Sequence, residues 1–158
     1  MSEGLPNLVT GLRPVMDSLP PAAQPGFMAG LERQAAGNYR QWAEAADDSV
    51  LAIGLRLCAA REDSVADIIE TTFPSDPSHA APLQEAAAQL QAAGDPFAGY
   101  EPAECMRMQA AAERNGAAAW RQIAMGIDDA ASRRALEICA HLEEQSADFL
   151  ESWLGSGL

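Results

Sequence analysis

The chain has 158 residues, of which 48% are hydrophobic and only 6% aromatic, and its formal net charge is -13 at pH 7. The length suits one domain with a core of its own, so we expect a single domain over residues 1–158, and the hydrophobic fraction excludes a disordered chain. The negative charge disfavours binding to nucleic acid or to an anionic membrane surface, and no apolar run is long enough to span a membrane.

The cysteines and the N-terminus together predict a cellular location. Three cysteines are present, Cys58, Cys105 and Cys139, which is an odd and sparse set for a disulfide framework. The N-terminal segment MSEGLPNLVTGLRP lacks the basic stretch and long apolar run of a signal peptide. We therefore expect a protein of the reducing cytoplasm, in which Cys105 is a structural or exposed residue.

The first half of the chain predicts a helical hairpin preceded by an arm. Residues 1–20 contain a short apolar segment that ends at two prolines, and we expect an arm or short helix there. A first long helix is predicted over about 21–46. The pair Asp47-Asp48 is typical of a turn and a helix cap, after which a second long helix is predicted over about 49–70. Residues 21–70 therefore form a first hairpin.

The second half predicts a crossover and another hairpin. Residues 71–102 contain two loops rich in proline and polar turn formers, with a short helix predicted between them over 79–93. A third long helix is predicted over about 103–126 and a fourth over about 130–154, so that residues 103–154 form the second hairpin. Alternation typical of strands is missing from the sequence, and the predicted fold class is all-α.

The two hairpins repeat each other at an offset of 81 residues. Residues 32–70 and 113–151 align without a gap, and 15 of the 39 positions are identical. The matches extend beyond alanine to Glu32/Glu113, Arg40/Arg121, Asp47-Asp48/Asp128-Asp129, Cys58/Cys139, Glu62/Glu143 and Glu70/Glu151. Because neither hairpin can bury its apolar face alone, we expect the pair to pack into a four-helix bundle with a crossover connection.

One glutamate interrupts the apolar stripe of each long helix. These glutamates are Glu32, Glu62, Glu113 and Glu143. Burying a lone carboxylate costs several kcal/mol unless the group is paired, protonated or bound to a metal. The stripes therefore predict four carboxylates directed toward the axis of the bundle, where two divalent ions would neutralise them.

The motif Glu-Arg-x-Ala-x-x-x-Tyr-Arg-x-x-Ala, followed by a turn and a helix with a central glutamate, resembles the ferritin-like superfamily, and rubrerythrin-like domains most closely. The resemblance covers about residues 21–154. It implies a site for two irons, to which the first and third helices give one Glu each and the other two a Glu-x-x-His pair each. All four Glu positions match this chain, but Val65 and Ser146 stand where the family has histidine, so the dimetal motif is degenerate.

Two functions follow from this degenerate motif. One is a non-catalytic binding or structural module, in which the glutamates pair with arginine or with each other, or turn to the solvent. The alternative is a metal-binding oxidoreductase or metal-handling protein, in which the four glutamates hold one or two divalent ions of iron, manganese or zinc. Whether the protein is an enzyme stays open, and bundles of this kind lead us to expect a homodimer.

Other residues near the glutamates have predicted roles of their own. Cys58 and Cys139 lie four residues before Glu62 and Glu143 on the same helix faces. They are either secondary metal-ligand candidates or small core residues. Tyr39 and its repeat equivalent Trp120 are expected to fill the core. A further prediction is that Arg33, Arg40, Arg114 and Arg121 form ion pairs between helices.

Overall fold

The computed structural model describes residues 5–156, and among these residues there are helices but no strand. The α-helices are α1 (Leu8–Ser18), α2 (Gln24–Ala45), α3 (Ser49–Thr72), α4 (Ala80–Ala93), α5 (Pro102–Met125) and α6 (Ala130–Gly155), with 3₁₀ turns at Pro21–Ala23 and Pro77–His79. The prediction of an all-α protein is therefore confirmed.

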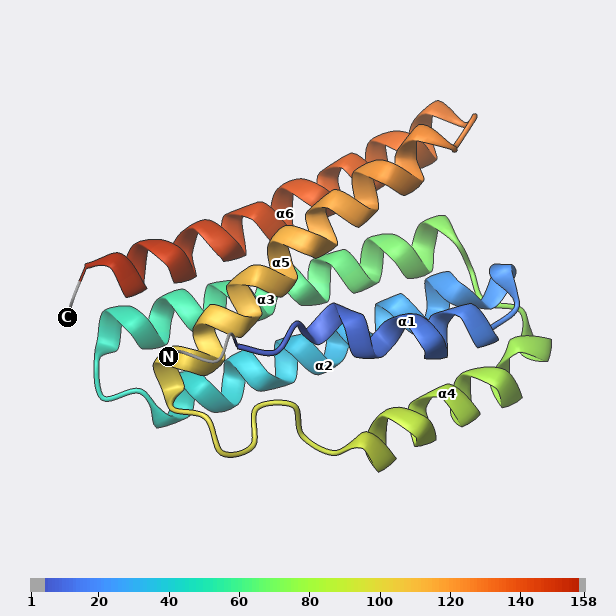
Figure 1. Cartoon of the computed structure of the whole chain (residues 1–158). Coiled ribbons are helices and arrows are strands. Elements are labelled where there is room, and N and C mark those ends of the chain that lie inside the picture. The colour runs from blue at the N-terminus through green and yellow to red at the C-terminus, as the bar shows by residue number, and fades with distance from the viewer. Residues whose placement is uncertain (1–4, 157–158) are drawn as a thin grey trace.

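The four long helices form two neighbouring pairs (Figure 1). Helix α2 packs along α3, and α5 packs along α6, while the closest packing between the two pairs is that of α3 against α6. The connections within the pairs, 46–48 and 126–129, are too short to allow any arrangement but an antiparallel one. The segment 73–101, which contains α4, carries the chain from the end of α3 back to the opposite end of the molecule, where α5 begins (Figure 1).

The observed helix ends lie within a few residues of the predicted ones, and two differences have local causes. The first long helix begins at Gln24 rather than at Pro21, since residues 21–23 form a 3₁₀ turn. The second continues to Thr72, so the predicted loop begins two residues later than expected. Pro74 explains this stop, because a proline disfavours helical backbone in the residue before it, here Phe73.

The predicted aspartate caps are confirmed at both hairpin turns. At the start of α3, Oδ1 of Asp48 accepts hydrogen bonds from the backbone N–H groups of Val50 and Leu51, at 2.8 and 2.9 Å. At the start of α6, Oδ2 of Asp129 accepts one from the N–H of Ser132 at 2.7 Å. Each aspartate satisfies backbone donors that the first helical turn cannot pair internally.

The N-terminal arm is a helix that packs beside the bundle. Leu19, at the end of α1, is buried together with Phe27 of α2 and Ala86 of α4, and Leu83 and Leu90 of α4 pack against them. The arm and the crossover helix thus cover one outer side of α2 with an apolar cluster of their own.

The core of the four long helices divides into two apolar clusters. One contains Ala29, Val65, Ala66, Ile69, Ala117, Trp120, Ala124, Leu136, Cys139 and Ala140. The other contains Ala36, Tyr39, Ala43, Leu55, Cys58, Ala59, Met106, Ala110 and Leu150. In every long helix the glutamate lies in the sequence between the residues given to the two clusters. The four glutamates therefore form a polar layer between two apolar ones.

Helices α3 and α6 approach each other closely at Gly54. A Cβ atom at this position would lie 1.9 Å from Cζ of Phe149 on α6, which is far too close for two carbon atoms that are not bonded to each other. Only glycine leaves room for the aromatic ring against the backbone of α3. The missing side chain at Gly54 therefore allows α3 and α6 to pack closely at this level.

Candidate metal centre

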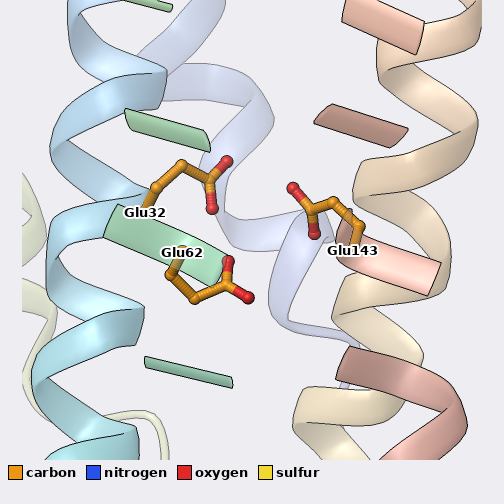
Figure 2. Close-up of side chains that lie close together, drawn as sticks. All are labelled: Glu32, Glu62 and Glu143. Carbon is orange, nitrogen blue, oxygen red and sulfur yellow. The ribbon is translucent and has the colours of Figure 1, made fainter. Parts of the chain in front are cut away.

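The structure places all four sequence-predicted glutamates in the layer between the two apolar clusters. Glu62, Glu113 and Glu143 are buried, with 1%, 1% and 3% of their surface exposed. Glu32 is intermediate in exposure, because part of the residue reaches the surface while its carboxyl group faces the other glutamates (Figure 2). The alternative in which the glutamates turn to the solvent is therefore wrong for Glu62, Glu113 and Glu143.

Three of these carboxyl groups come together from three different helices. Glu32 of α2, Glu62 of α3 and Glu143 of α6 each offer an oxygen, and the three oxygens lie within 4.8 Å of one another. Figure 2 shows Glu32 and Glu62 on one side and Glu143 on the other, with their carboxyl groups directed into the space between them. Such spacing fits three oxygen ligands around one divalent cation, because metal–oxygen distances are about 2.0–2.6 Å.

The fourth glutamate is held by two hydrogen bonds to the same oxygen. Oε1 of Glu113 accepts one from the hydroxyl group of Tyr39 and one from Nε2 of Gln109, both at 2.7 Å. Tyr39 lies on α2 and Gln109 one turn before Glu113 on α5. The two donors orient the carboxylate and leave Oε2 as its free atom.

Two further donors reach the layer that sequence reasoning did not identify. Nε1 of Trp120 donates to Oε1 of Glu143 at 2.9 Å, and the hydroxyl group of Ser146 donates to Oε1 of Glu62 at 3.1 Å. Tyr39 and Trp120 fill the core as predicted, with 0% and 2% of their surface exposed. The sequence does contain an indication that Tyr39 and Trp120 also donate hydrogen bonds. The side chain of each has a single polar group, and each residue lies on an apolar helix stripe that also contains a glutamate.

Two carboxylate oxygens in this layer have no hydrogen-bond partner. They are Oε2 of Glu62 and Oε2 of Glu113, both fully buried. A buried acceptor without a partner costs about 1–3 kcal/mol, and more if it is charged. Either a proton on a carboxyl group or a bound cation would satisfy these two atoms.

Burial and neighbouring carboxylate charges raise the pKa of Glu32, Glu62 and Glu143. Burial, and then the neighbouring charge of Glu113, raise the pKa of Glu32 from 4.5 to about 8, although the nearby carboxyl group of Glu62 acts in the opposite direction. Burial also raises the pKa of Glu62 and of Glu143 well above the usual value, followed by the charges of the neighbouring glutamates. Ionising the whole layer in a metal-free protein is therefore unfavourable.

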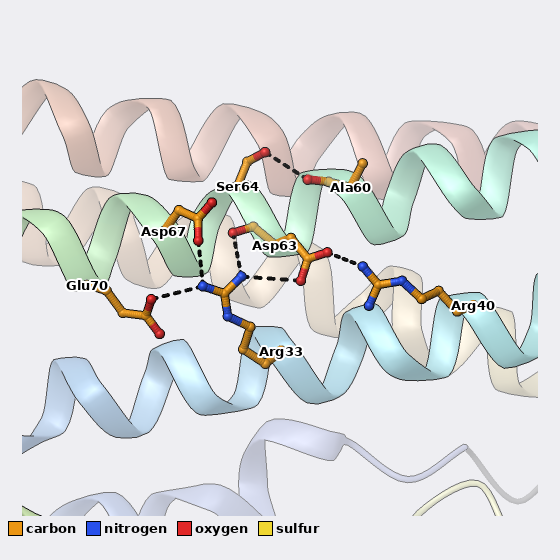
Figure 3. A network of polar contacts seen from close by, with 7 residues as sticks. All are labelled: Arg33, Arg40, Ala60, Asp63, Ser64, Asp67 and Glu70. Atoms are coloured by element: carbon orange, nitrogen blue, oxygen red, sulfur yellow. Dashed lines mark hydrogen bonds and ion pairs between the residues drawn. The ribbon is translucent and has the colours of Figure 1, made fainter.

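Arginine does not neutralise this layer. Arg33 of α2 contacts Asp63, Asp67 and Glu70 of α3, with its closest ion pair at 2.5 Å to Asp67, and Arg40 also pairs with Asp63 (Figure 3). The predicted ion pairs between helices are thus confirmed for both arginines. Their partners are carboxylates on the outer face of α3, so the expectation that arginine would pair with the buried glutamates is wrong.

The second hairpin has matching ion pairs. Arg114 of α5 contacts Asp148 and Glu151 of α6 at 2.5 and 2.6 Å, and Arg121 contacts Glu144 at 2.6 Å. Each of these residues lies 81 positions after its counterpart in the first hairpin. Among residues 5–156, no ion pair joins an arginine to any of the four buried glutamates.

The cysteines are core residues in the structure. Cys58 and Cys139 have 0% of their surface exposed and belong to the two different apolar clusters. Burial raises the pKa of Cys58 to about 11 and that of Cys139 to about 12, so both remain thiols at neutral pH. Cys105 is buried near the start of α5, and its Sγ lies 3.7 Å from the carbonyl oxygen of Tyr100.

Neither histidine reaches the glutamates. His141 is exposed and contacts Gln145 on its own helix at 3.1 Å. His79 lies in the 3₁₀ turn before α4, outside the four long helices. Val65 lies in an apolar cluster, and Ser146 contacts Glu62 through its hydroxyl group. The donors within reach of the layer are therefore oxygen atoms and N–H groups.

Comparison of the chain with protein-family models, with curated proteins and with solved structures finds no match. None of the helices in residues 5–156 combines the length and the apolar character that crossing a membrane requires.

Proposed function

We propose that the chain is a ferritin-like four-helix bundle built from two repeated hairpins. The support is the offset of 81 residues, which relates the glutamates of α2 and α3 to those of α5 and α6. The same offset relates the ion pairs of Arg33 with Asp67 and Glu70 to those of Arg114 with Asp148 and Glu151. An approximate two-fold relation between the hairpins accounts for both correspondences.

We propose further that the function of this bundle is to bind a divalent metal through its buried glutamates. The observation that carries the proposal is the carboxyl group of Glu62, which faces Glu32 and Glu143 and whose Oε2 has no hydrogen-bond partner. A cation at this point satisfies the unpartnered oxygen and offsets the repulsion between three carboxylates. In this proposal Glu113 is a fourth ligand through its own unpartnered Oε2.

The experiment is metal analysis of the purified protein. The chain is expressed with iron, manganese and zinc available, purified without chelator and analysed for metal per chain. We expect stoichiometric metal, lost in Glu62→Gln but retained in the matched control Glu85→Gln, since Glu85 is exposed on α4. At a free metal concentration of 100 Kd, binding stabilises the fold by about 2.7 kcal/mol, or roughly 5–10 °C in Tm. A metal-free protein whose Tm does not change with added metal would refute the proposal.

A second candidate function is a metal-free structural module, and one group of contacts favours it. Ser146 donates to Glu62, and oxygens of Glu32, Glu62 and Glu143 lie within 4.8 Å of one another. Such contacts suit a layer that is neutralised by protons instead of metal. Glu62→Leu distinguishes the two candidates, because replacing an unneeded buried carboxyl group with leucine stabilises the metal-free fold, whereas replacing a ligand abolishes stabilisation by metal.

The proposal includes a homodimer in the cytoplasm. Val50, Ile53 and Leu57 lie three and four residues apart on α3 and are 63%, 56% and 53% exposed, which supports contact with a second copy. The three unbonded cysteines fit a reducing compartment. Sedimentation of the wild type and of Ile53→Glu tests the dimer: we expect a dimer for the wild type and a monomer for the variant, while a monomeric wild type contradicts this part of the proposal.

A further inference from the structure

The donor atoms that surround the space between the glutamates are hard oxygens. Three carboxylates supply oxygens within 4.8 Å of one another, from Glu32, Glu62 and Glu143. Ser146 adds a hydroxyl oxygen 3.1 Å from the Glu62 carboxylate. Oxygen-only donor sets suit Mg²⁺, Ca²⁺ and Mn²⁺, whereas thiolate and imidazole ligands favour Zn²⁺ and copper.

Sulfur lies close by in the sequence but not in the polar layer. Cys58 precedes Glu62 by one helical turn and packs with Tyr39 and Leu55 in one apolar cluster. Cys139 precedes Glu143 by one turn and packs in the other cluster. Among residues 5–156, no sulfur or imidazole nitrogen joins the group of ligand atoms formed by the three glutamates.

The buried atoms of the glutamate layer that lack a hydrogen-bond partner are also oxygens. Oε2 of Glu62 and Oε2 of Glu113 are the carboxylate oxygens without partners, and both residues are 1% exposed. Ser146 and Tyr39 occupy the other oxygen of the same two carboxyl groups. Each of these carboxylates therefore presents one oriented and unpartnered oxygen to a cation.

We infer that the centre takes a hard divalent cation of the Mn²⁺ class through oxygen ligands alone, and that Cys58 and Cys139 remain outside its coordination sphere. This inference rests on the proposed metal-binding function and specifies its cation. Affinity by itself does not test it, because Zn²⁺ binds most sites of nitrogen, oxygen and sulfur more tightly than Mn²⁺ does. The identity of the ligand atoms is the decisive property.

Cobalt(II) reports the ligand atoms directly, since thiolate coordination produces an intense sulfur-to-metal charge-transfer band in the near ultraviolet and oxygen coordination does not. The metal-free full chain is titrated with Co²⁺ and, separately, with Mn²⁺ followed by its electron paramagnetic resonance signal. We expect both ions to bind, and we expect only the weak visible bands of oxygen-coordinated cobalt. A charge-transfer band that disappears in Cys58→Ser/Cys139→Ser overturns the inference while leaving the proposed function intact.

Two variants complete the test. We expect Cys58→Ser/Cys139→Ser to bind Mn²⁺ with an affinity within about threefold of the wild type, because serine keeps the branching of the cysteine side chain and no ligand is lost. We expect Glu62→Gln to weaken Mn²⁺ binding by about tenfold or more, because it removes a charged ligand. If the wild type binds neither Mn²⁺ nor Co²⁺, the proposed metal-binding function is wrong, and the inference about the cation is then wrong as well. If the double variant does not fold, the spectrum of wild-type cobalt protein still decides the question.

Discussion

Tyr39 of α2 and Glu113 of α5 belong to different hairpins, and a hydrogen bond of 2.7 Å joins the hydroxyl group of the tyrosine to Oε1 of the glutamate. Both side chains are fully buried. Because Gln109 donates to the same oxygen, the tyrosine helps to determine which oxygen of Glu113 stays free. The contact links the packing of the two hairpins to the geometry of the polar layer.

The variant Tyr39→Phe tests this link. It retains the ring but removes a donor from a buried carboxylate, so we expect the metal-free protein to lose about 1–3 kcal/mol of unfolding free energy in urea. Tyr100 provides the control, since it is the other tyrosine of the chain and is 38% exposed. Tyr100→Phe should change stability by less than about 0.5 kcal/mol. Equal effects of the two variants would show that the bond to Glu113 contributes nothing specific.

The outer ion pairs of the hairpins should contribute equally and modestly. The side chains of Arg33 and Arg114 are both 39% exposed, so solvent screens their contacts, and we expect each change to alanine to cost roughly 0.5–1 kcal/mol. The cost should decrease in 1 M salt, where the screening length is about 3 Å. Urea denaturation of each variant measures this. Arg13→Ala is the control with an expected change near zero, because the pair of Arg13 with Asp17 is largely exposed at 3.7 Å. A cost above about 2 kcal/mol that does not respond to salt is the result that contradicts this prediction.

The helices and the polar layer could be predicted because both depend on local periodicity. Apolar residues at three- and four-residue steps fix which face of a helix is buried, and Glu62 and Glu143 lie on that face. Aspartates before a helix satisfy free N–H groups, so Asp48 and Asp129 marked the turns correctly.

The partners of the glutamates could not be predicted in the same way, because they depend on distances between helices. Ser146 and Glu62 are 84 residues apart in the chain, and nothing in either helix alone indicates their contact. Arg33 was predicted to form an ion pair between helices, but its partners Asp67 and Glu70 could not be named from either helix alone. Adjacent helical residues point about 100° apart, and Arg33 therefore does not share the inward direction of Glu32. The close contact of Gly54 with Phe149 also depends on the packing of α3 against α6.

The stability of the metal-free protein should fall as the pH rises from about 4.5 to about 8. The pKa of Glu32 is 4.5 in the unfolded chain and about 8 in the folded protein, where burial and the charge of Glu113 disfavour ionisation. Within this window the folded state holds more protons than the unfolded state, and raising the pH therefore favours unfolding, by an amount on the order of a few kcal/mol. Denaturation in the presence of a chelator at several pH values measures this slope.

Two comparisons control this pH profile. Glu32→Gln is neutral at every pH, so its slope between pH 4.5 and pH 8 should be smaller than that of the wild type. With saturating Mn²⁺ the trend should reverse, because binding requires deprotonated carboxylates and becomes tighter as the pH rises. A metal-free wild type whose stability rises across this window would contradict the raised pKa values of the layer.

Gly116 should control the position of Glu143. A Cβ atom at Gly116 on α5 would lie 2.7 Å from Oε2 of Glu143, too close for both atoms to keep their places. The carboxyl group is the end of a flexible side chain and can move, so we expect Gly116→Ala to fold. The same change in an exposed helix interior gains about 0.5–1 kcal/mol, but here the displaced carboxylate offsets that gain.

The measurement is Mn²⁺ affinity together with unfolding free energy, and Gly37→Ala is the matched control. No atom lies within 4 Å of a Cβ built at Gly37, which is also in a long helix, so this variant should gain stability and bind Mn²⁺ as the wild type does. Gly116→Ala should bind Mn²⁺ about tenfold or more weakly, because Glu143 can no longer reach Glu32 and Glu62. Unchanged affinity in Gly116→Ala would mean that Glu143 is not a ligand. The cation would then be held by the carboxylates of α2, α3 and α5 alone.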